Sequence, residues 1–273
     1  MNIFKLTAIA GLTAIMSVSA LAGISATKHN LGSSGTGPNK TTGTTEICVF
    51  CHTPHGGSTD APLWNKVMPL DTDFTAYTST TLDGSAVLSG SPSLACLSCH
   101  DGQQAMDSMI NAPSTSTDYM FDSTGVQTLA TGVWAGNQTM TNTAGEFVPM
   151  LGTDLSNDHP VAVPYAGGGL STTNVNPANF ADKDFNQPAT AFIGGQNVWW
   201  LDTANGTAGR DKSDIILYTR DYTDATPTTY ATGYVECASC HDPHVENPQF
   251  LRPIAGATGG NEGSQVCLAC HNK

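Results

Sequence analysis

Cys48-Val49-Phe50-Cys51-His52 is the first of four copies of one pattern, and together the copies use all eight cysteines of the chain. The other copies are Cys96-Leu97-Ser98-Cys99-His100, Cys237-Ala238-Ser239-Cys240-His241 and Cys267-Leu268-Ala269-Cys270-His271. In C-x-x-C-H, the two thiols form thioethers to a c-type haem and the histidine binds its iron. A zinc half-site, a redox dithiol or a disulfide would not need a histidine after the second cysteine four times. The pattern therefore predicts four covalently bound haem c groups and a tetrahaem cytochrome.

The histidine count predicts the second axial ligand of each iron. Of eight histidines, the motifs use four, which leaves His29, His55, His159 and His244. Six-coordinate haem iron needs one further ligand per haem, so four spare histidines indicate bis-histidine ligation throughout. No coordination site on any iron then remains open for a substrate. Full coordination favours an electron carrier over an enzyme. Methionine can also ligate iron, but with the count already filled we interpret the six methionines after residue 22 as packing residues: Met68, Met106, Met109, Met120, Met140 and Met150.

The spare histidines belong to an internal repeat. Each half of the chain reads His, then CxxCHxPH, then CLxCH, beginning with His29 in the first half and His159 in the second. This predicts a single domain over residues 23–273. It consists of two dihaem modules, at about residues 23–110 and 150–273, joined by a haem-free segment.

The spacing within a module restricts which haem each histidine can serve. His55 follows His52 by three residues, a reach of roughly 10 Å, so it cannot pass round its own haem to the opposite face. We expect His55 to bind the haem of the second motif and, by the same argument, His244 to bind that of the fourth. His29 and His159 are left for the haems of the first and third motifs. The alternative is an exposed turn histidine at His55, His159 or His244, or a disordered arm at His29.

The first 22 residues have the form of a secretory signal peptide. Lys5 precedes an apolar run, and Ala20-Leu21-Ala22 forms an A-x-A cleavage site before Gly23. We expect a secreted protein at the cell surface or beyond it, or alternatively in the periplasm, with no membrane span. Removing Lys5 leaves nine basic and 23 acidic residues, a net charge of −14. So acidic a chain is a poor match for nucleic acid or anionic membranes.

Four haems among about 250 residues would form much of the apolar core themselves. We therefore expect a mostly irregular, coil-rich, haem-cored chain with short helices at the haem motifs and a few short strands. Residues 94–107 are the best helix candidate, and residues 198–201 and 215–218 the best strands. Trp199 and Trp200 are interpreted as core or haem-packing aromatics.

The order of motifs resembles the doubled CxxCH modules of multihaem cytochromes, and in particular the tetrahaem outer-surface cytochromes of the OmcE-like group. The resemblance rests on Thr27-Lys28-His29-Asn30-Leu31, residues 48–55, Ala61-Pro62-Leu63-Trp64-Asn65, residues 152–160 and residues 267–273. It implies polymerisation into extracellular nanowires with alternating parallel-stacked and T-shaped haem pairs, all bis-histidine, and one axial histidine donated across the subunit boundary. His29 is the candidate for that ligand, because it lies in a Gly/Ser/Thr-rich arm that could extend up to about 65 Å.

Three functions compete at this point. The first is a homopolymeric filament that conducts electrons to partner cytochromes or extracellular acceptors. The second is a soluble periplasmic electron shuttle. The third, the electron-input subunit of a multihaem reductase, requires one histidine to be unused.

Overall fold

The computed structural model describes residues 23–58, 61, 63–111, 119–121, 127–129, 134–135, 139–141, 149–203, 209–223, 228–252 and 262–272. The predicted signal peptide, residues 1–22, lies outside the described residues, as does the side chain of Met120. In this part of the chain no helix is long and apolar enough to cross a membrane.

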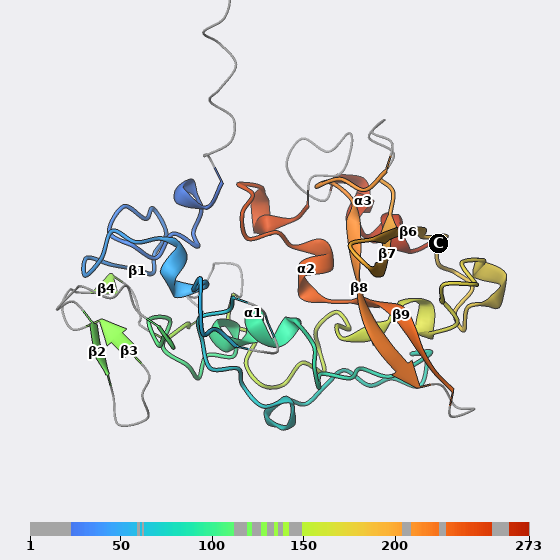
Figure 1. The fold of residues 1–273 in the computed structure, drawn as a ribbon, viewed down its shortest axis with the longest axis horizontal. Helices are drawn as coiled ribbons and strands as arrows, with labels where there is room; N and C mark the ends of the chain where they lie inside the picture. Colours follow the sequence, from blue (N-terminus) through green and yellow to red (C-terminus); the bar gives the residue numbers. More distant parts are fainter. Residues whose placement is uncertain are drawn as a thin grey trace, which may run out of the picture.

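A five-stranded antiparallel sheet dominates the C-terminal half (Figure 1). Its order is β5-β9-β8-β7-β6. The strands are β5 (Val163–Pro164), β6 (Ala189–Ile193), β7 (Gln196–Leu201), β8 (Ile215–Thr223) and β9 (Thr229–Val235). The expectation of a mostly irregular chain is therefore wrong, because these segments pair with one another rather than wrapping singly around haem.

Turn chemistry and alternation explain the sheet. Gly194 and Gly195 have φ of 61° and 86°, the left-handed conformation that a two-residue hairpin requires, and they join β6 directly to β7. At the start of β8, Ile215 and Leu217 are buried while Ile216 and Tyr218 are half-buried, the period-two pattern of a sheet with one covered face. The strands expected at residues 198–201 and 215–218 lie within β7 and β8.

Among the described residues, two small sheets, three short helices and several 3-10 turns make up the rest of the regular structure. β1 (Lys40–Thr41) pairs with β4 (Trp134–Ala135), and β2 (Tyr119–Phe121) pairs with β3 (Gln127–Leu129). The helices are α1 (Ser93–His100), α2 (Cys237–Cys240) and α3 (Gln265–Cys270). The helix expected over residues 94–107 ends at His100, and Gly102 then takes a φ of 71°. The 3-10 turns are η1 (Ile24–Ala26), η2 (Cys48–Phe50), η3 (Asp71–Asp73), η4 (Tyr165–Gly167), η5 (Pro177–Asn179), η6 (Pro248–Phe250) and η7 (Glu262–Ser264).

Three apolar clusters form the core. One lies against the large sheet, contains the fully buried Trp199, and packs on the side chain of Cys240. A second gathers Leu31, Phe50 and methionines around Cys51 and Cys99. The third lies beneath α1 around Leu97. Trp199 and Trp200 are buried as predicted. So are Met106, Met109 and Met140, which confirms them as packing residues in this structure.

Candidate haem-binding sites

Each C-x-x-C-H motif begins on a helical turn. The first lies on η2, the second on α1, the third on α2 and the fourth on α3. In a helical turn, residues three and four apart share one face, so both thiols and the following histidine of a motif can project together. None of the eight cysteines forms a disulfide. Across the described residues, no three His, Cys, Asp or Glu side chains converge as a metal-ion site.

The motifs follow one another in space in their sequence order. Burial, and then the neighbouring thiol of Cys99, raise the pKa of Cys51 to about 12. A hydrogen bond between the Cys96 and Cys237 thiols raises the pKa of Cys96 and lowers that of Cys237. Burial, then the thiol of Cys237 in the same motif and that of Cys267 in the fourth, raise the pKa of Cys240 to about 11. The first motif thus neighbours the second, the second neighbours the third, and the third neighbours the fourth.

A buried carboxylate joins the second motif to the third. Glu236, whose side chain is wholly buried, precedes α2 and accepts hydrogen bonds from Ser91 Oγ at 2.5 Å and Ser93 Oγ at 2.6 Å, just before and at the start of α1. Arg220 on β8 donates to the same carboxylate at 2.9 Å. The backbone N–H of Cys237 donates to Ser93 Oγ at 3.0 Å. The sheet and both helices therefore meet at Glu236.

Asn65 and Arg252 play equivalent parts behind the first and third motifs. The backbone N–H of Asn65 donates to the carbonyl of the second cysteine of its motif at 2.9 Å, and its side chain to the residue after the first cysteine at 2.7 Å. The backbone N–H and side-chain Nε of Arg252 bind the same two carbonyls of the third motif, at 2.8 and 3.1 Å. The repeat seen in the motifs thus extends to the loops that close behind them, which sequence reasoning missed.

Most of the site histidines have one ring nitrogen held by an acceptor. The Nδ1 atoms of four of them contact the following oxygens: His100 with Pro149 O, His159 with Pro160 O, His241 with Gln249 O and His244 with Asp242 Oδ1. The ring of His52 bonds the Leu63 carbonyl, which partly offsets the lowering of its pKa by burial and by His244. A histidine whose Nδ1–H is held in this way presents a free Nε2 lone pair to a metal. These residues therefore fit haem iron as the group to be bound.

The four spare histidines lie in different surroundings. His29 is partly buried and stacks on Phe250, with ring centroids 4.2 Å apart. Burial, and then His100, lower its pKa to about 4, while the Pro243 carbonyl acts in the opposite direction. By distance and angle, however, Nδ1 of His29 is buried without a hydrogen-bond partner among the described residues.

The structure brings two of the spare histidines to motif histidines. The ring of His29 lies 6.1 Å from that of His100, and the ring of His244 lies 6.3 Å from that of His52. His55 and His159 are exposed, and neither is in ring contact with another histidine of the described residues. The haem assignments made from spacing did not foresee these two pairs.

Lys66 is a fully buried cation beside the first two motifs. Its ammonium donates to the carbonyls of Ala105, Met106 and Ser108 at 2.8, 3.3 and 2.9 Å, which uses all three donors. Its positive charge lowers the pKa of Cys99, although burial raises that pKa more. No local pattern marks this lysine, because its partners lie about 40 residues further along the chain.

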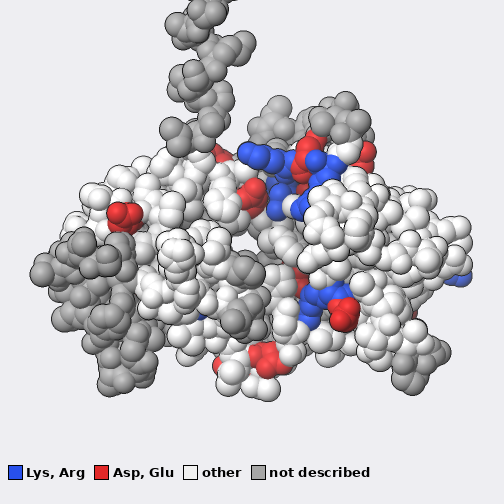
Figure 2. All heavy atoms as spheres, in the orientation of Figure 1, with Lys and Arg blue, Asp and Glu red and all other residues white. Residues whose placement is uncertain are grey.

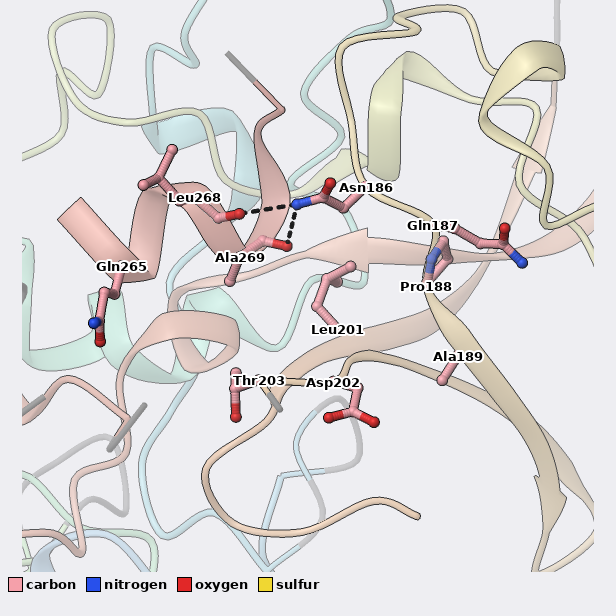
Figure 3. A pocket seen from close by; sticks show the side chains of 10 residues that line it. All are labelled: Asn186, Gln187, Pro188, Ala189, Leu201, Asp202, Thr203, Gln265, Leu268 and Ala269. Carbon is pink, nitrogen blue, oxygen red and sulfur yellow. Dashed lines mark hydrogen bonds between the residues drawn. The ribbon is translucent and has the colours of Figure 1, made fainter. Parts of the chain in front are cut away.

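An open pocket of about 570 Å³ lies beside the fourth motif (Figure 3). Gln265, Leu268 and Ala269 of α3 line one side, and Asn186 crosses to the carbonyls of Leu268 and Ala269 at 2.9 and 3.2 Å. At 100° per residue these helix positions face away from the two thiols of the motif. The pocket is therefore not the site of the haem itself.

Comparison with known proteins finds a match to the C-terminal motif pair. A family model described as the doubled CXXCH motif matches residues 230–273, which contain the third and fourth motifs. No curated protein matches the chain significantly. The match covers 44 of the 273 residues, indicates covalent haem c attachment at the third and fourth motifs, and suggests a multihaem c-type cytochrome that transfers electrons.

Proposed function

We propose that the protein is a four-haem electron carrier in which every iron has two histidine ligands. The observation that carries this proposal is the contiguity of the four motifs: Cys51 and Cys99 pack on one apolar cluster, Cys237 bonds to Ser93 at the start of the second-motif helix, and Cys240 and Cys270 share another cluster. Bound haem supplies one-electron exchange between ferric and ferrous iron. The chain contributes the thioether anchors, the ring nitrogens turned toward iron by Nδ1 contacts, and rigid links such as Glu236 that keep neighbouring sites close.

We further propose that the secreted protein polymerises outside the cell into a conductive filament. Two surface features support self-association. Strand β6 is an edge strand on which Phe192 and Ile193 are 72% and 51% exposed, and an unpaired apolar edge favours contact with another chain. On the face shown in Figure 2 the charged side chains gather in a few groups and most of the described surface between them is uncharged, so contact on that uncharged surface would desolvate few charges.

Negative-stain microscopy of material sheared from the cell surface tests the filament. We expect fibres whose only haem-staining polypeptide is this chain, and their loss when its gene is deleted and return when it is restored. Recovery of the holoprotein only as a monomer in the periplasmic fraction would contradict the filament and would instead support a soluble periplasmic electron shuttle. A pair of single variants, Phe192→Ser and Phe74→Ser, then separates an edge contact from general destabilisation, because Phe74 is half-buried against the Leu97 cluster and Phe192 is exposed on the edge strand. Only Phe192→Ser should shorten or abolish fibres while leaving haem content unchanged.

A further inference from the structure

We propose that the second half of the chain completes a haem site of the first half: His244 ligates the haem of Cys48 and Cys51 opposite His52. His29 in turn ligates the haem of Cys96 and Cys99 opposite His100. The inference rests on the proposed four-haem function. It assigns the second axial histidine of two of the four haems.

The ring separations carry the assignment. Two imidazoles bound to opposite sides of one metal at about 2 Å have their ring centroids about 6 Å apart. The His52–His244 and His29–His100 pairs are separated by 6.3 and 6.1 Å. By contrast, His29 and Phe250 are in direct stacking contact at 4.2 Å. The two histidine pairs thus have the ring spacing expected of two imidazoles that bind the same iron atom from opposite sides.

The loop after the third motif supports both pairs. Asp242 holds Nδ1 of His244 at 2.9 Å, which leaves its Nε2 available to bind iron. In the same loop the Pro243 carbonyl lies against the His29 ring, and Phe250 covers one face of that ring. A single segment of the second half therefore positions His244 directly and fixes the plane of His29.

The assignment differs from the one that spacing suggests. Spacing directs His244 to the fourth motif, whereas its ring faces that of the first-motif histidine. Spacing also assigns His29 to the haem of the first motif or to a neighbouring subunit. In the structure, the ring of His29 lies 6.1 Å from that of His100 in the same chain. The ligand count then leaves His55 and His159 for the haems of the third and fourth motifs.

Removing one haem at a time tests which iron His244 serves. In a Cys48→Ser/Cys51→Ser background, which should carry three haems by mass, adding His244→Ala should change no further haem from low to high spin. In a Cys267→Ser/Cys270→Ser background, the same His244→Ala change should convert one of three haems to high spin. The reverse result in the two backgrounds would overturn the assignment. A mass showing that the cysteine changes removed no haem would instead overturn the proposed function.

The angle between ring planes supplies a readout that needs no haem deletion. The rings of His29 and His100 are nearly perpendicular at 87°, and those of His52 and His244 are nearly parallel at 13°. Perpendicular ligand planes leave two iron d orbitals almost degenerate, which gives ferric haem a large-gmax EPR signal, whereas parallel planes give a rhombic one. We expect His29→Ala to remove one haem's worth of large-gmax signal, and His244→Ala, which removes a ligand of the nearly parallel pair, to leave that signal intact. Unchanged large-gmax intensity in His29→Ala would contradict the pairing.

Discussion

Replacing Glu236 by alanine should lower the free energy of unfolding of the holoprotein by about 3–5 kcal/mol, because it removes one partner of a buried ion pair. The change leaves Arg220, whose side chain is only 12% exposed, without its carboxylate. It also deprives the hydroxyls of Ser91 and Ser93 of their acceptor. Chemical denaturation followed by the haem absorbance measures the loss.

The matched control is Glu246→Ala, since Glu246 is exposed and should change stability by less than about 0.5 kcal/mol. Because Glu236 connects α1 to α2, its loss should also increase proteolysis at that joint before the rest of the protein unfolds. Equal stability of the two variants would mean that the second and third motifs are held together by other contacts.

Replacing Lys66 by methionine should destabilise the first two motifs by at least about 3 kcal/mol, since three charge-assisted hydrogen bonds disappear and three carbonyls lose their donor. It should also lower the reduction potentials of the haems nearest to it. A buried positive charge favours the reduced, less positive iron, and the effect is strong where little water screens it. Potentiometric titration of the holoprotein detects this shift.

Lys183→Met is the control for charge alone, because Lys183 is exposed and its charge is screened by water. It should leave both stability and potentials unchanged. If Lys66→Met lowered stability but shifted no potential, Lys66 would be a structural cation and not a determinant of haem potential.

The local parts of this fold and site follow from sequence patterns. Cysteine and histidine spacing locates all four attachment motifs, and the β-branched and aromatic runs at residues 198–201 and 215–218 predict the cores of β7 and β8. Strand β9 (Thr229–Val235) was not predicted, although its threonines, tyrosines and valine favour a strand, because Ala231 and Gly233 interrupt the run and its pairing with β8 comes only with the fold. The expectation that haem replaces regular structure overlooked this pairing.

The contacts that join the motifs come from distant parts of the chain. Ser91 and Glu236 lie 145 residues apart, and Lys66 binds carbonyls about 40 residues away. No local periodicity encodes such contacts. The three-residue step from His52 to His55 excludes only the haem of the same motif, so it cannot choose among the other three. Only the folded chain brings His244 opposite His52.

Quantifying low-spin ferric haem per polypeptide, by EPR integration together with the intact mass of the purified protein, tests the central claim most directly. The account predicts four covalent haem additions and four low-spin haems per chain, with no binding of carbon monoxide after reduction, because every iron has two histidine ligands. A mass with fewer than four haems, or one haem or more in the high-spin state, would contradict it.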